Sequence, residues 1–78
     1  MGSKDLWDPL CAALGAAVRA RREGLGISQE AFANKVDLER SYVSGIERGV
    51  RNPTLRVIAR IAKGLRTKPS QLLADAGK

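Results

Sequence analysis

Glycine and proline residues divide this chain into short segments, and this division limits the possible fold more than any other feature of the sequence. Between these helix-breaking residues, apolar side chains recur every three or four positions, as they do along one face of a helix. No stretch alternates apolar and polar residues as a half-buried strand does. The pattern predicts an all-α fold of five short helices, at about residues 9–23, 28–35, 39–47, 54–64 and 69–75.

Typical capping residues lie at the expected starts of these helices. Asp8-Pro9 is an N-cap followed by proline at the first helical position, and Ser28 and Thr54 precede the second and fourth helices. We therefore predict an N-terminal tail, residues 1–8, and a single domain, residues 9–77.

Helices this short are marginally stable alone in water, so each depends on burying its apolar face against the others. The residues predicted to face the core are Leu10, Leu14, Ala17, Val18, Ala31, Phe32, Val36, Val43, Ile46, Leu55, Ile58, Ile61, Ala62 and Leu65. Trp7 and Cys11 are interpreted as an apolar attachment of the N-terminal segment, since an unpaired cysteine is usually buried.

The composition excludes several kinds of functional site. The 78 residues include no histidine and one cysteine, which rules out a Cys/His zinc site, a Ser-His-Asp triad, a Cys-His dyad and a disulfide within one chain. No apolar run approaches the roughly 20 residues that span a bilayer, and the first residues lack the apolar stretch of a signal peptide. We therefore expect a cytoplasmic binding protein without catalytic residues, metal, cofactor, small-molecule ligand or membrane contact.

The net charge of +6 and the pI near 10.3 favour a polyanionic partner, and the charge by itself would leave nucleic acid, an acidic membrane surface and an acidic protein all open. The positive charge is unevenly distributed, because residues 29–52 hold four basic and four acidic side chains, whereas residues 53–78 hold six basic side chains and one acidic one. Arg56, Arg60 and Lys63 share one face of the fourth predicted helix. Either a solvated surface or phosphate binding would account for these three cations.

Residues 28–53 carry the pattern of a helix-turn-helix. Two short helices are separated by the break Val36-Asp37-Leu38. Ala33 is small at the middle of the first helix, which lets the second helix cross it closely at a steep angle. Asp37 lies where the chain must reverse, and we expect a positive φ there because Asp tolerates the left-handed conformation better than most residues.

The second helix of this pair has a polar outer side. Its outward residues are predicted to be Arg40, Ser41, Tyr42, Ser44 and Gly45, which suit DNA base edges and phosphates. Arg40 is the outward arginine of the first turn, and its guanidinium fork matches the O6 and N7 acceptors of guanine. We expect Arg40 to read a guanine, Ser41 and Ser44 to adjust neighbouring positions, and Tyr42 to lie near the DNA backbone or a thymine methyl group.

The motifs SQE.FA, VSGIERG.RNP and IAKGL resemble the Cro and phage-repressor (lambda-repressor-like) family of helix-turn-helix domains, over about residues 15–75. The resemblance implies sequence-specific binding of double-stranded DNA by a transcriptional regulator. It also implies an internal ion pair between Arg22 and Glu47. The residues that it places on DNA phosphates are Gln29, Arg48, Arg51 and Asn52.

Within that family, residues 38–48 most resemble the small controller proteins of restriction–modification systems. This implies a homodimer that binds two operator half-sites and regulates its own operon and a neighbouring restriction endonuclease gene. The adjacent Leu72 and Leu73 cannot both face a small core, so we expect one of them to enter a C-terminal dimer interface. An antitoxin or phage-type repressor of the same fold, which would also bind a protein partner, is the alternative.

Overall fold

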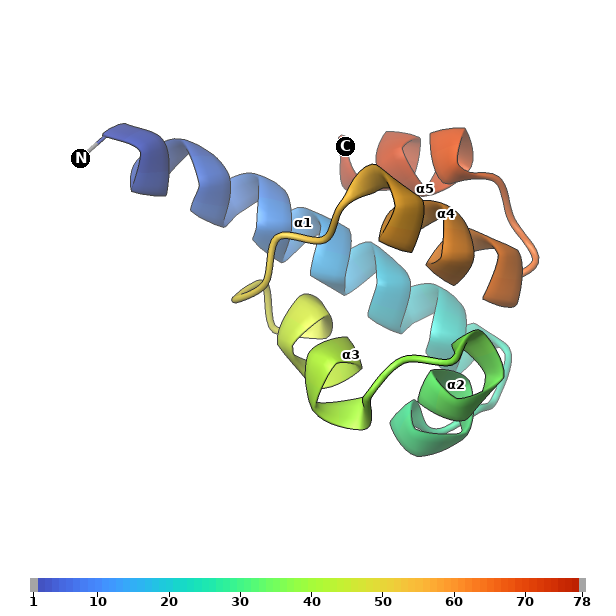
Figure 1. The fold of residues 1–78 in the computed structure, drawn as a ribbon. Coiled ribbons are helices and arrows are strands. Elements are labelled where there is room, and N and C mark those ends of the chain that lie inside the picture. The colour runs from blue at the N-terminus through green and yellow to red at the C-terminus, as the bar shows by residue number, and fades with distance from the viewer. Residues whose placement is uncertain (1, 78) are drawn as a thin grey trace.

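The computed structural model describes residues 2–77 of the chain, and the side chains of residues 9–77. Its helices are α1 (Gly2–Gly24), α2 (Gln29–Val36), α3 (Arg40–Glu47), α4 (Leu55–Gly64) and α5 (Pro69–Ala76) (Figure 1). No strand occurs in residues 2–77, so the prediction of an all-α fold is confirmed. None of the helices in this part of the chain is long and apolar enough to cross a membrane.

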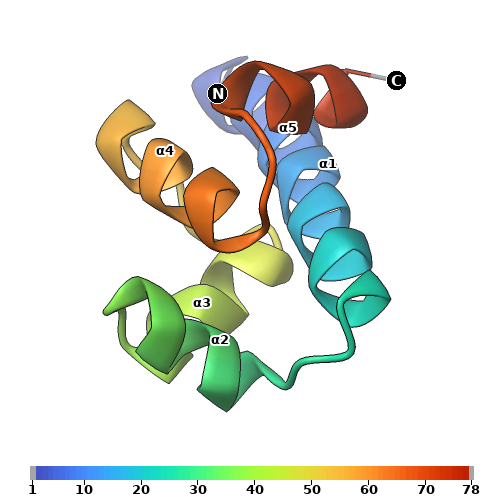
Figure 2. The same ribbon diagram turned by 90° about the vertical axis from the view of Figure 1, so that its right-hand side faces the viewer.

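The long helix α1 connects the two ends of the molecule. It contacts α3 and α5, while α2 contacts α3 and α4, and α4 contacts α5. Figure 2 shows α5 beside α1 at one end and the α2–α3 pair at the opposite end, with α4 between them. The helix-turn-helix pair is therefore separated from α5, the helix that carries Leu72 and Leu73.

Helix α1 begins at Gly2, so the predicted start at Asp8-Pro9 is wrong. The proline lies inside the helix and removes one N–H donor, while the preceding residues, such as Lys4 and Leu6, favour helix and continue it toward the N-terminus. These first turns extend beyond the other helices in Figure 1. Leu10 is accordingly 50% exposed instead of lying in the core, whereas Cys11 is buried. The side chain of Trp7 lies outside the described residues.

Local hydrogen bonds define the ends of the shorter helices. The hydroxyl of Ser28 accepts from the backbone N–H of Ala31 at 3.1 Å, and that of Thr54 accepts from Val57 at 3.2 Å. Helix α2 ends at Asp37, whose φ of 59° and ψ of 48° place it in the left-handed region. The predicted positive φ is confirmed, and this residue turns the chain between α2 and α3.

All five helices contribute to one core. Its largest fully buried side chains are Val18, Phe32, Val43, Ile46, Ile61 and Leu72. The prediction is wrong at Ala31 and Leu55, which are exposed. Helix α2 turns Ala33 inward instead of Ala31, because the small residue is needed where α3 crosses. Leu55 belongs to the apolar stripe of α4, but it lies in the first turn, before the helix reaches the core. Its side chain is therefore 76% exposed.

The left-handed turn between α2 and α3 gives a testable prediction. Asp37→Gly is expected to leave the free energy of unfolding unchanged or to raise it by up to about 1 kcal/mol, because glycine adopts positive φ without steric strain. Asp37→Val is the control, and it should destabilise the protein by about 1–2 kcal/mol, since a β-branched residue is strained there. Urea unfolding measures both effects. A clear loss of stability in the glycine variant would contradict the assigned turn.

Candidate nucleic-acid interface

Helix α3 presents one polar face to solvent. Val43 and Ile46 are buried and fix this helix on the core. The predicted base-contacting residues all lie on α3, where two are exposed and two are half-buried: Arg40, Ser41, Tyr42 and Ser44. We call these four residues the reading face, of which Tyr42 also packs partly against the core. Arg40 is the first residue of α3 and is exposed, so its guanidinium lies at the helix N-terminus that helix-turn-helix proteins direct at base edges.

Gly45 was expected to be open to solvent, and this expectation is wrong. The residue is buried, because the side chain of Arg51 lies over it. A Cβ at position 45 would come within 2.7 Å of Arg51 Cγ. The guanidinium carbon of Arg51 lies 5.6 Å from the centroid of the Tyr42 ring, in a cation–π arrangement. Arg51 therefore lies directly beside the reading face.

Two further residues predicted to bind phosphate, Arg48 and Asn52, follow α3. Arg48 and Asn52 are exposed, and Arg48 Nε donates to Ser44 Oγ at 3.4 Å. Gly49 fixes the path of the loop after α3. Its φ is 77°, and it lies so close to α1 that a Cβ at this position would be 2.7 Å from Ala12 Cα. Only glycine satisfies both the backbone angle and the close approach. Arg48 and Arg51 thus lie against residues of α3, and Asn52 is exposed in the loop that follows.

Arg22 and Glu47 meet in a buried ion pair. Arg22 Nε lies 2.7 Å from Glu47 Oε2, Nη2 donates to Oε1 at 3.1 Å, and the two side chains are 9% and 2% exposed. Arg22 Nη1 also donates to the carbonyl oxygen of Ile27 at 2.7 Å. The hydrogen bond to Glu47 raises the pKa of Arg22 above its ordinary value. This pair ties the end of α1, the loop before α2 and the last residue of α3 together.

Gln29 joins this ion pair. Its side-chain amide donates to Glu47 Oε1 at 2.9 Å. The family resemblance implies that Gln29 contacts a phosphate, but it does not predict this bond, since no spacing in the sequence indicates a contact between residues so far apart. Gln29 is the first residue of α2 and is half-buried, so the bond holds the start of α2 against the end of α3.

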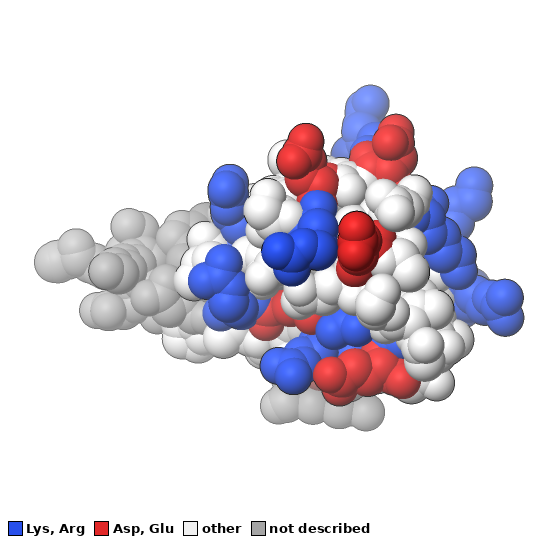
Figure 3. Space-filling view, turned by 90° about the horizontal axis from the view of Figure 1, so that it is seen from below, with Lys and Arg blue, Asp and Glu red and all other residues white. Residues whose placement is uncertain are grey.

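Charges of both signs occur on the side of the molecule where α2 and α3 lie. Figure 3 shows this side from below the view of Figure 1, with acidic and basic side chains interspersed. The pattern agrees with the four basic and four acidic residues of segment 29–52. Affinity for a polyanion on this side therefore depends on individual contacts more than on a uniform positive field.

Two short helices at a left-handed turn, braced by a buried ion pair and presenting a polar outer face, form a helix-turn-helix unit. A family model described as helix-turn-helix matches residues 18–72. Control protein C.MunI of Mycoplasma sp. is 42% identical over 60 residues, which are 77% of this chain and 81% of that protein.

Two solved structures of controller proteins are similar to this one. The restriction-modification controller protein C.AhdI from Aeromonas hydrophila has a TM-score of 0.77 and 40% identity, covering 80% of this chain and 94% of that chain. The controller protein C.Esp1396I, as a tetramer in complex with its natural 35 base-pair operator, has a TM-score of 0.76 and 33% identity, covering 88% and 96%. The chain belongs to the helix-turn-helix family of DNA-binding transcriptional regulators and, within it, to the restriction–modification controller proteins.

Removing one partner of the buried ion pair is expected to destabilise the fold strongly. Glu47→Ala leaves the Arg22 guanidinium buried without its carboxylate, and we expect a loss of about 3–5 kcal/mol in the free energy of unfolding. Arg19→Ala is the control. It breaks the exposed Arg19–Glu23 pair, whose side chains are 64% and 54% exposed, and should cost less than about 1 kcal/mol. Equal losses in the two variants, measured by urea unfolding, would refute the bracing role of Glu47.

Proposed function

We propose that this protein binds an operator as a homodimer and regulates its own operon together with a neighbouring restriction endonuclease gene. Its membership of the controller-protein family supports this role. The observation that carries the proposal is the exposed Arg40 at the start of α3, on a helix whose other side is fixed in the core. The protein acts by binding in the cytoplasm, without a catalytic step or a cofactor.

Direct recognition of bases rests mainly on Arg40 in this proposal. Its side chain can reach guanine O6 and N7 with two parallel hydrogen bonds, a geometry that lysine or serine cannot supply. Ser41 and Ser44 are too short for such paired contacts and adjust neighbouring positions. Tyr42 lies under the Arg51 guanidinium, so its ring is held at the edge of the reading face, near a thymine methyl group or the DNA backbone.

Four side chains would bind phosphates and set the position of α3 in the groove. Arg48, Arg51 and Asn52 are exposed directly after α3, where they could meet the DNA backbone. Gln29 would act with the free N–H groups at the start of α2. Its bond to Glu47 orients the amide, and a phosphate would become a further partner of that group.

The dimer interface would use the exposed part of α5. Leu72 is fully buried in the monomer core, whereas Leu73 is 40% exposed, so Leu73 is the member of the pair that a partner can cover. Leu55, exposed at the start of the neighbouring α4, adds apolar surface. A two-fold interface would present this patch twice and align two recognition helices with two half-sites.

Arg40→Ala tests the reading of guanine. An operator is first selected from a random DNA pool with the wild-type protein, and affinities are then measured on a panel of single-base changes. The variant should lose about 1–3 kcal/mol on the selected operator and should lose its preference at one base pair in each half-site.

Arg51→Ala is the matched control, because it removes the same side chain from a phosphate-binding position. It should reduce the salt dependence by about one unit per half-site and leave the preference at the base pair read by Arg40 unchanged. Identical behaviour of the two variants across the panel would refute the assignment of Arg40.

Leu73→Asp tests the dimer interface. Sedimentation at high micromolar concentration should find a dimer for the wild-type protein and a folded monomer for the variant, because a charge at the interface centre is costly to bury. Leu25→Asp is the control, since Leu25 is also 40% exposed but lies in the loop before α2. A strictly monomeric wild-type protein, or equal dissociation of both variants, would rule out this interface.

A further inference from the structure

The positive charge of the chain is concentrated away from the reading face. Residues 53–78 hold six basic side chains and one acidic one, Asp75. That carboxylate already bonds Arg21 at 2.6 Å and Gln71 at 3.0 Å. Most of the net charge therefore lies on α4 and the residues after it, and binding through α3 does not account for it.

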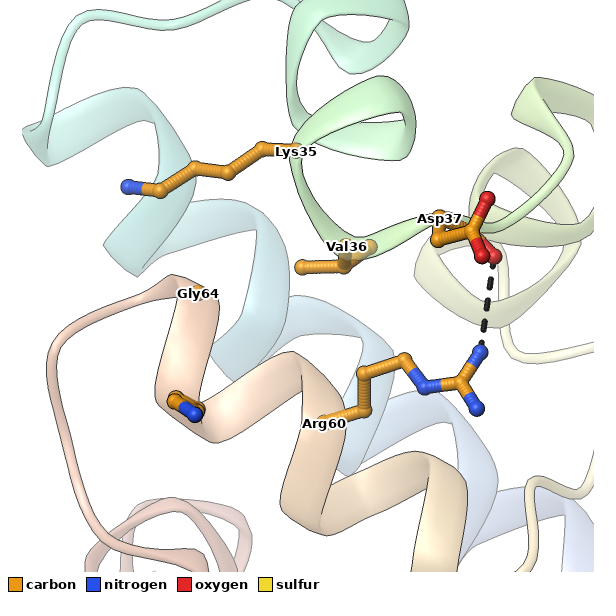
Figure 4. Close-up of a pocket in the computed structure, with 6 residues that line it drawn as sticks. Lys35, Val36, Asp37, Arg60 and Gly64 are labelled. Atoms are coloured by element: carbon orange, nitrogen blue, oxygen red, sulfur yellow. Dashed lines mark hydrogen bonds between the residues drawn. The ribbon is translucent and has the colours of Figure 1, made fainter.

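Part of this charge lines a cleft between α2 and α4. The cleft has a volume of about 430 Å³, and its lining residues are Lys35, Val36, Asp37, Arg60, Lys63 and Gly64. We call it the α2–α4 cleft. Figure 4 shows Lys35 extending from α2 and Arg60 from α4, with Val36 between them. Three cations from two helices thus line the cleft together with the acidic side chain of Asp37, whereas Val36 is only 5% exposed.

These cations have little internal compensation. Among residues 9–77, no carboxylate lies within 4 Å of the charged groups of Lys35, Arg60 or Lys63. Arg60 Nη1 donates to the backbone carbonyl of Asp37 at 3.4 Å, which leaves its other N–H groups open. Lys35 and Lys63 each lie in the last turn of their helix, where a cation interacts favourably with the helix dipole. The helix dipole explains the position of each lysine separately, but it does not explain why both lysines line the same cleft.

The walls of the α2–α4 cleft are fixed by tight packing. A Cβ at Gly64 would overlap the side chain of Val36 and come within 3.1 Å of a ring carbon of Phe32. Glycine therefore lets α4 approach α2 closely at this point. A ligand would meet a preformed surface, so binding would cost little rearrangement of the backbone.

We infer that the α2–α4 cleft binds an acidic segment of a partner protein, with carboxylates on Lys35, Arg60 and Lys63. None of the lining residues belongs to the reading face of α3, so this charge lies apart from the proposed DNA-binding surface, which favours a polypeptide over DNA as its occupant. Arg60 and Lys63 also lie about 8 and 12 Å along α4 from Leu55, the end of the helix that adjoins the DNA-binding loop. A protein could therefore occupy the cleft while α3 is in the groove.

The test is an NMR titration of the ¹⁵N-labelled protein with a synthetic peptide that carries two glutamates on each side of a leucine. Addition of the peptide should shift the amide signals of Val36, Asp37 and Gly64. The same peptide with glutamine in place of glutamate should shift none of them. A short duplex of random sequence, added at the same salt concentration, is the competing probe.

Two double variants that remove equal charge identify the site. Lys35→Gln with Lys63→Gln should weaken peptide binding about tenfold. Arg56→Gln with Lys68→Gln, outside the cleft, should weaken it less than about twofold through the lower net charge. All four side chains are exposed, so the fold should persist, as thermal unfolding would verify. Equal losses in the two variants, no shift with the glutamate peptide, or larger shifts of the cleft amides with duplex DNA would overturn the inference.

Discussion

The buried ion pair between Arg22 and Glu47 holds the DNA-binding part of the molecule in one arrangement. Arg22 comes from the end of α1 and also bonds the loop before α2, while Glu47 ends α3 and accepts from Gln29 at the start of α2. Three helix ends therefore meet at the Glu47 carboxylate, and Arg22 ties the loop before α2 to them. Because both charges are buried, each satisfies the other, and the geometry of α2 relative to α3 cannot shift without exposing an uncompensated charge.

Close backbone contacts also hold α1 against α3 and the loop that follows it. A Cβ at Gly15 would overlap the carbonyl oxygen of Ile46, so α1 lies directly against the end of α3. Gly49 brings the following loop against Ala12 in the same way. The polar residues of the reading face thus project from a helix that is supported along its inner side, which suits recognition by individual contacts with limited help from the surrounding charge.

Local signals in the sequence predicted the helices, apart from the start of α1, and the turn. The distant Arg22–Glu47 pair was predicted only from the family resemblance, and the bond between Gln29 and Glu47 was not predicted. Capping by Ser28 and Thr54 and the left-handed Asp37 depend on neighbouring residues, so they could be read directly. The exposure of Leu55 depends on where α4 meets the core, and the burial of Gly45 depends on a side chain six positions later in the loop. Hydrophobic periodicity describes one helix at a time, so it predicts neither where a helix meets the core nor which loop side chain covers it.

Because Leu72 and Leu73 are adjacent, folding of the monomer and the proposed dimerisation depend on the same helix. The two side chains leave α5 about 100° apart, so the same short helix closes the monomer core on one side and meets the proposed partner on the other. Folding of the monomer therefore orders α5 for dimerisation, and dimerisation in turn stabilises α5 in the monomer core. In such a dimer the folded lifetime of each newly made chain rises with the number of chains present. When few chains are present, the first copies would therefore be the ones most open to proteolysis.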